Sequence, residues 1–344
     1  MRFDEPRAHW LEVGGLALAS LLLFRFGLLA LVFLVPVQLA WIRRGEEGGL
    51  IASGGVLAGI ALMKVFDLVR IRRSMGGADI PEGLLLLDLV FAAGLLAGLF
   101  VLNSDRMRVG TGEHDSRELT VAERMFAAIG VGALVYGPTV AMIAVGDAGA
   151  SVIAAQIEVF RPLFETAGAT TEEIRVLVEI VVGALLNALL FGYFLMLVGN
   201  WWFGLLLAFR SRFTLPAGNP IMARLAGYEL TEFRLPVYLV WALIGAWGGV
   251  LLTELVEVGW LSYVFWNAAF TMLALYAIQG VAIVWYYLDR RGVGGGARIG
   301  LAVGMVFGLL IPGVQLAIGL GLPGLGISEI WIDYHRFQGS EEGQ

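Results

Sequence analysis

The chain has 344 residues, of which 58% are hydrophobic and 15% are charged, and its mean hydropathy is +0.81. Soluble proteins average about 45 to 50% apolar and about 25% charged residues, so this composition excludes an ordinary soluble protein. The net charge of -6 provides no basic field for nucleic acid, and the lack of cysteine excludes disulfides and thiolate metal sites.

Apolar segments recur along the whole chain. Because a hydrocarbon core about 30 Å thick needs roughly 20 apolar residues per helix, repeated segments of this kind predict a polytopic protein. We expect an all-α fold, a transmembrane helical bundle of about 8 to 9 membrane helices that forms a single integral membrane domain over residues 1–344. The segments lie near 10–24, 26–42, 49–66, 83–103, 125–146, 176–208, 235–256, 261–288 and 299–321.

Arginine clusters and aromatic residues predict the orientation. With the N-terminus inside, residues 209–234 and 289–298 are cytoplasmic, because cytoplasmic segments carry an excess of arginine and lysine. The basic cluster at 64–73 does not fit this topology. If 83–103 were a hairpin rather than a span, that cluster would move inside and the N-terminus would move out.

Three connections between the segments are long. Residues 104–123 are polar and lack periodicity, which predicts a flexible loop, and residues 209–234 predict a basic cytoplasmic linker. Residues 150–170 predict an amphipathic helix on the membrane surface, with Pro162 kinking or ending it. Thr170 and Glu173 have the spacing of a capping box, which predicts that the next helix starts near 171.

Polar residues inside apolar segments are the first candidates for function, because they are costly in lipid. For Asp88 and Glu179, a functional role and a satisfied pair between helices are equally open. For the amides, hydrogen bonding between helices competes with lining a solute pathway. The candidate ligand or polar-network residues are Asp88, Glu179, Asn187, Asn267 and Gln279. They would define a site only if they share one water-accessible cavity.

Glycines at a spacing of four form small-residue stripes. Such stripes permit close approach of helices, usually within one chain. The candidate helix-packing residues are Gly94, Gly98, Gly300, Gly304 and Gly308.

Enzyme signatures are missing from the sequence. The three histidines form no HExxH pair, and the glycine-rich stretches lack the lysine of a phosphate-binding loop. His114 stands in a polar loop beside Glu113 and Asp115, which indicates a solvated loop rather than a metal site. We therefore expect no enzymatic activity, no cofactor and no metal.

Three stretches of the last third carry a family resemblance. FRLPVYLVW at 233–241, FWNAAFTMLALYAIQGVAIVWYYLDRRG at 265–292 and GLGISEIWIDYHRF at 324–337 resemble the YybS-like family of multi-pass bacterial membrane proteins, a domain of unknown function. The resemblance implies a helical bundle in the bacterial cytoplasmic membrane. The family is distantly similar, at the level of the fold, to substrate-binding subunits of energy-coupling-factor transporters. This is an analogy of fold and brings no reaction with it.

Two functions remain open from the sequence. The first is binding of a small solute for transport, which requires polar groups that converge on one cavity. The second is a scaffold or partner subunit of an envelope protein complex, which requires an apolar surface of small residues. In both cases the lipid bilayer is a partner and nucleic acid is not.

Overall fold

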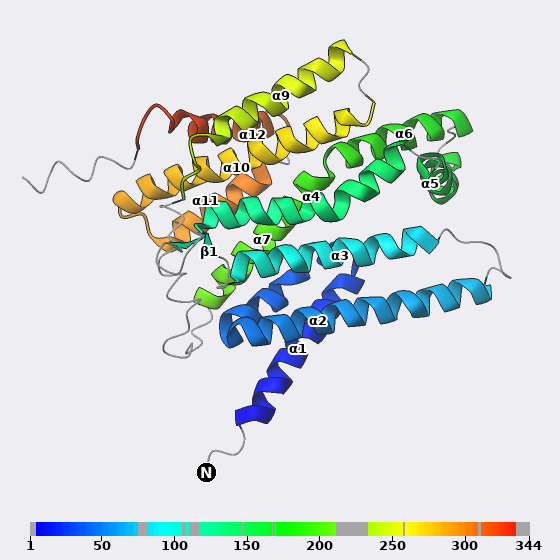
Figure 1. Cartoon of the computed structure of the whole chain (residues 1–344), viewed down its shortest axis with the longest axis horizontal. Helices are drawn as coiled ribbons and strands as arrows, with labels where there is room; N and C mark the ends of the chain where they lie inside the picture. Colours follow the sequence, from blue (N-terminus) through cyan, green and yellow to red (C-terminus); the bar gives the residue numbers. More distant parts are fainter. Residues whose placement is uncertain are drawn as a thin grey trace, which may run out of the picture. The chain divides into compact units, whose positions relative to one another are not determined.

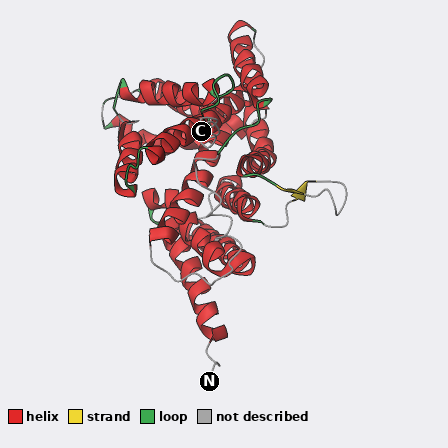
Figure 2. Cartoon of the chain, turned by 90° about the vertical axis from the view of Figure 1, so that its left-hand side faces the viewer, coloured by secondary structure: helices red, strands yellow, loops and turns green. Residues whose placement is uncertain are grey.

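The computed structural model describes residues 5–74, 82–104, 108–109, 117–145, 148–166, 168, 170–210, 233–256, 259–308 and 311–334. These residues are almost entirely helical, as Figure 2 shows, which confirms the predicted all-α fold. They belong to two compact units. Unit 1 is drawn from residues 1–143 and 192–226, and unit 2 from residues 144–191 and 227–344.

Unit 1 is built from the N-terminal helices and most of α7 (Figure 1). Its helices are α1 (Glu5–Arg25), the 3-10 helix η1 (Gly27–Val32), α2 (Leu34–Ser74), α3 (Glu82–Asn103), α4 (Val121–Val145) and α7 (Leu189–Arg210). Two short strands, β1 (Arg108–Val109) and β2 (Arg117–Glu118), pair antiparallel within the segment that the sequence predicts as a loop.

Unit 2 holds the remaining helices. They are α5 (Ala148–Glu165), α6 (Thr171–Asn187), α9 (Leu239–Leu255), α10 (Leu261–Arg290), α11 (Gly295–Gly308) and α12 (Val314–Ser328). The tightest crossing joins α10 and α12. A Cβ added at Gly280 would overlap the carbonyl of Leu322, and one added at Gly326 would overlap the carbonyl of Tyr276. The two glycines therefore let the helix backbones touch.

Four helical stretches among the described residues are long and apolar enough to cross a membrane. They are Gly27–Arg70, Val121–Ile143, Leu189–Ala208 and Leu261–Arg290. Shorter apolar helices lie at Asp88–Asn103, Leu239–Leu255 and Val314–Ser328. The protein is thus a multi-pass membrane protein with four long candidate spans.

Three predicted segments are divided differently in the structure. The segment at 26–42 begins as η1, and α2 continues through a kink at Gly45 into the segment predicted at 49–66; Gly45 has φ 69° and ψ -160°. The segment at 176–208 breaks at Ala188 into α6 and α7. The segment at 299–321 is two helices, α11 and α12, because the chain turns at Gly313, whose φ is 88°.

Local signals set the starts of two helices. At α6, the Thr170 hydroxyl accepts a hydrogen bond from the Glu173 N–H, and the Glu173 carboxylate accepts one from the Thr170 N–H. The predicted capping box is confirmed. Thr120 and Glu123 make the same bonds ahead of α4. Most of the predicted linker at 209–234 lies outside the described residues.

Candidate functional site

Asn267 fills the break between α6 and α7. In a continuous helix the N–H of Leu190 would donate to the carbonyl of Leu186. Instead, the Asn267 side-chain oxygen accepts from the Leu190 N–H at 2.7 Å, and its amide nitrogen donates to the Leu186 carbonyl at 2.6 Å. The same nitrogen donates to Tyr263, one turn back on α10. This asparagine therefore replaces a missing helix bond, which is a structural role.

Asn200 makes the same set of bonds within unit 1. Its side-chain oxygen accepts from the Leu34 N–H at 3.1 Å, and its nitrogen donates to the Leu31 carbonyl at 2.7 Å, across the junction of η1 and α2. It also donates to Met196, one turn back on α7. Both units therefore satisfy a broken helix with an asparagine from another helix.

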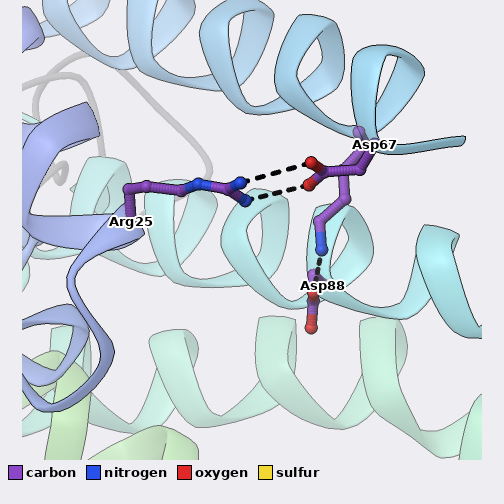
Figure 3. A network of polar contacts seen from close by, with 4 residues as sticks. Arg25, Asp67 and Asp88 are labelled. Atoms are coloured by element: carbon purple, nitrogen blue, oxygen red, sulfur yellow. Dashed lines mark hydrogen bonds and ion pairs between the residues drawn. The ribbon is translucent and has the colours of Figure 1, made fainter. Parts of the chain in front are cut away.

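Asp88 belongs to a group of four charged side chains near one end of three helices (Figure 3). It pairs with Lys64 of α2, while Arg25 at the end of α1 makes two hydrogen bonds to Asp67 of α2, at 2.9 and 3.3 Å. Lys64 and Asp67 are three residues apart, so they lie on one face of α2. Two cations and two anions balance, and the group links α1, α2 and α3 without net charge.

Glu179 and Asn187 lie elsewhere on α6. Glu179 is exposed and pairs with Arg175 at 2.9 Å, one turn away. The side-chain oxygen of Asn187 is buried and has no hydrogen-bond partner among the residues that the structure describes. Within the described structure, no hydrogen bond or ion pair joins either residue to Asn267 or Gln279.

Gln279 lies at the α10–α12 crossing and holds a buried carboxyl group. Its side-chain oxygen accepts from the Leu235 N–H at 3.1 Å, and its nitrogen donates to Glu329 at 2.8 Å. The Glu329 side chain is only 6% exposed, and its second oxygen lies 3.8 Å from Nε of Arg234. Arg234 also pairs with Asp333 at 3.3 Å. We call Gln279, Glu329, Arg234 and Asp333 the Glu329 cluster.

Aromatic side chains adjoin the Glu329 cluster. The hydroxyl groups of Ser328 and Tyr334 are 2.9 Å apart, and Ser328 precedes Glu329 in the chain. The ring of Tyr334 meets the ring of Tyr287 on α10 edge to face, with centroids 6.2 Å apart. Carboxylates next to electron-rich rings are suited to bind an organic cation, because the faces of aromatic rings attract positive charge.

The position of Gln279 along α10 sets the depth of the cluster. Trp285, Tyr286 and Tyr287 stand before Arg290, as an interfacial aromatic belt does. Gln279 lies six residues before Trp285, or about 9 Å deeper along the helix axis. A carboxylate held below the belt is a functional candidate by default, since ionisable groups are costly in lipid.

The two glycine stripes differ in their surroundings. Gly94 and Gly98 of α3 accommodate the hydroxyl groups of Tyr136 and Tyr193, and Tyr193 donates to the carbonyl groups of Gly94 and Ala128. On α11, Gly308 lies against side chains of α12, whereas no described atom lies within 4 Å of a Cβ added at Gly300 or Gly304.

Four of the five candidate residues, Asp88, Glu179, Asn267 and Gln279, each have their own partners in the structure. Asp88 belongs to unit 1. Asn267 and Gln279 belong to unit 2 and are about 18 Å apart along α10, and each bonds a different segment of the chain. Sequence reasoning missed Glu329, although the motif GLGISEIWIDYHRF that carries the family resemblance includes it. It also missed Arg124, which is 2% exposed and donates to the carbonyl of Ser104 past the end of α3. Among the described residues, no group of three His, Asp or Glu side chains is arranged to hold a metal ion.

Comparison with known proteins identifies one family. A search of curated proteins and of solved structures finds no match to this chain. The family described as "Predicted membrane protein (DUF2232)" matches residues 120–323, which is more than half of the chain and includes α10 and the first part of α12. The chain therefore belongs to the DUF2232 family of predicted membrane proteins.

Proposed function

We propose that this protein is a transport-related membrane protein that binds a small organic cation at the Glu329 cluster. The observation that carries the proposal is the Glu329 carboxylate, buried below the aromatic belt of α10 and held by the Gln279 amide. A carboxylate placed at this depth, with the carboxylate of Asp333 paired to the same arginine, favours a ligand with a positive group. The tyrosine rings at its edge favour an ammonium over a hydrated metal ion.

The residues of the cluster have distinct roles in this proposal. Glu329 neutralises the ligand's charge, and Gln279 positions the carboxylate by donating its N–H. Arg234 lies near the second oxygen of Glu329 at a distance beyond a hydrogen bond, so a ligand cation can compete with it. Gln279 also bonds the Leu235 N–H, which fixes the segment before α9 to the same point.

Thermal unfolding of the purified protein tests this proposal. Methylammonium, tetramethylammonium and choline chlorides are compared with sodium chloride at equal ionic strength. A ligand at ten times its Kd stabilises the folded state by about 1.4 kcal/mol, so binding raises Tm. We expect at least one ammonium to raise Tm of the wild type and to have no such effect on Glu329→Gln. Glu254→Gln, at an exposed position of α9, is the matched control and keeps the response. No shift in the wild type, or an equal shift in Glu329→Gln, contradicts the proposal.

The second function is a scaffold or partner subunit of an envelope protein complex. It is favoured by Gly300 and Gly304, beside which no atom of the described part of the chain lies within 4 Å of an added Cβ. A partner helix that packs there would be excluded by a large side chain. In this case Gly300→Leu removes proteins that co-purify with the wild type from native membranes, and Glu329→Gln retains them. The opposite pattern, or no co-purifying protein, contradicts the scaffold function.

The finer assignments belong to the same proposal. We place the protein in the YybS-like family and in the bacterial cytoplasmic membrane, with eight to nine crossings and no enzymatic activity. The resemblance of residues 265–292 and 324–337 and the arginine clusters near 209–234 and 289–298 support this assignment. Cysteines introduced at Ser211 and Gly294 should resist an impermeant thiol reagent in intact cells. Ready labelling of either position contradicts the topology.

A further inference from the structure

We propose that α6 is not part of a membrane crossing but lies in the membrane surface, with one face buried in lipid. The inference is independent of the proposed ligand site, because it rests on different residues. It rests on the hydrogen bond that joins the end of α6 to α10, on the single residue that links α6 to α7, and on the distribution of charged and apolar side chains around the axis of α6.

The attachment of α6 lies at the level of an aromatic belt. Asn267 binds the carbonyl of Leu186 at the end of α6. Asn267 is six residues from the first residue of α10, or about 9 Å along the axis, and directly follows Trp266. Trp260, Tyr263 and Trp266 mark the membrane boundary at this end of α10. The end of α6 is therefore close to the membrane surface.

The chain cannot turn back into the membrane at this point. The stretch Leu189–Ala208 is long and apolar enough to cross by itself, and it begins two residues after α6 ends. Ala188 alone separates the two helices, with φ -114° and ψ 8°. Antiparallel helices need a connecting loop of about two to five residues, so a single residue bends the chain and does not reverse it. If α7 crosses the membrane from this boundary, α6 does not enter the membrane beside it.

The side chains of α6 fall on three faces. At about 100° per residue, Ile174 and Val178 share one face, and both are buried in unit 2. A second face is charged and carries Glu172, Arg175 and Glu179. The third face is exposed and, beyond the capping residue Glu173 in the first turn, apolar; its members are Val176, Leu177, Ile180 and Val181, with Ile180 64% exposed. The centres of the charged and the exposed apolar faces are about 140° apart.

Three faces fit a helix that has three neighbours at once. The buried face packs within unit 2, where α6 contacts α5 and α10. The charged face fits water, and the apolar face fits the acyl chains of the same bilayer that α7 enters. If α6 crossed the membrane, Glu172, Arg175 and Glu179 would contact lipid over nearly two helical turns. Charged side chains in lipid raise the free energy of the folded protein, and a position at the membrane surface avoids that cost.

Spin labels in this cysteine-free chain test the inference directly. Single cysteines at Val176 and Ile180 probe the apolar face, and cysteines at Arg175 and Glu179 are matched controls on the same turns. The labelled proteins are reconstituted into phosphatidylcholine vesicles, and relaxation by oxygen and by a water-soluble nickel complex is measured. We expect severalfold higher ratios of oxygen to nickel accessibility at 176 and 180 than at 175 and 179, with equal and shallow depths for 176 and 180.

Two results would overturn the inference. Depth that increases steadily along 175, 176, 179 and 180 toward the bilayer centre would show that α6 crosses the membrane. Nickel accessibility at all four positions would show that the apolar face is outside lipid, as it would be if it bound another protein. Circular dichroism and thermal unfolding of each labelled variant establish that it is folded, so either result bears on the position of α6.

Discussion

Asn267 accepts a hydrogen bond from the backbone N–H of Leu190 at 2.7 Å, across the break between α6 and α7. The same side chain donates to the Leu186 carbonyl, so one amide restores both halves of a missing helix bond. In a membrane protein this matters more than in water, because unpaired backbone groups in lipid are costly.

Replacing Asn267 should therefore destabilise the protein. Asn267→Leu leaves the Leu190 N–H and the Leu186 carbonyl without their side-chain partner, at about 1 to 3 kcal/mol for an unsatisfied buried group. Asn187→Leu is the control, because the side-chain oxygen of Asn187 has no hydrogen-bond partner to lose. Thermal unfolding in detergent should show a clearly larger loss for Asn267→Leu. Equal losses would mean that the amide at the break is not needed.

The glycine stripes provide a second comparison. Gly98→Ala should lower the free energy of unfolding by about 1 to 3 kcal/mol, because its Cβ would overlap the hydroxyl of Tyr193, which is fully buried and has no room to move. Gly300→Ala should have little effect, since no atom of the residues that the structure describes lies within 4 Å of its Cβ position. A stable Gly98→Ala protein would contradict the close contact of α3 with α7.

The charged group of unit 1 predicts an asymmetry between single and double variants. Lys64→Met removes the cation that pairs with Asp88. The free energy of unfolding should fall by up to about 3 kcal/mol, the cost of an unpaired carboxylate within lipid. Lys64→Met combined with Asp88→Leu removes both charges and should be the more stable variant. Unfolding of the single and double variants, measured side by side, checks the order. A double variant less stable than Lys64→Met would mean that Asp88 has another role.

The capping box of α6 predicts a dependence on pH. The Thr170 backbone N–H, and then the Thr170 hydroxyl, bond the Glu173 carboxylate and hold the pKa of Glu173 below its usual value of 4.5. A lowered pKa stabilises the folded state above the unfolded value, and the effect is lost as the pH falls through the folded value. The protection of the amides at the start of α6, taken relative to their intrinsic exchange rates at each pH, should therefore fall on acidification in the wild type and change less in Glu173→Gln. Equal sensitivity in both would remove the carboxylate from this role.

Much of the helical content follows from the sequence, since the predicted segment 261–288 corresponds to α10 at 261–290 and the predicted start near 171 to α6. The turn between α11 and α12 had a local signal, because Pro312 and Gly313 interrupt the apolar run. The break at Ala188 had no local sequence signal. The side chain that bonds across it, Asn267, is 77 residues from Leu190, and a single sequence does not show which backbone groups a distant amide side chain will bond.

The candidate site was harder to predict for a related reason. Gln279 stood out as a polar residue in an apolar helix, whereas Glu329 follows an apolar segment and looks like a residue of a polar tail. Only the contact of Gly280 and Gly326 brings the two side chains together. The depth of Glu329 is thus a property of the α10–α12 crossing and not of its position in the chain.

Binding of a cation by the Glu329 carboxylate can be measured through the reactivity of a cysteine introduced next to it. Because the chain lacks cysteine, Ser328→Cys introduces a single thiol beside Glu329. The purified protein is treated with positively charged 2-aminoethyl methanethiosulfonate or with negatively charged 2-sulfonatoethyl methanethiosulfonate. We predict that the cationic reagent reacts severalfold faster than the anionic one, and that Glu329→Gln in the same background brings the two rates together. Failure of both reagents to react, or the same ratio of rates with and without Glu329, would contradict the account.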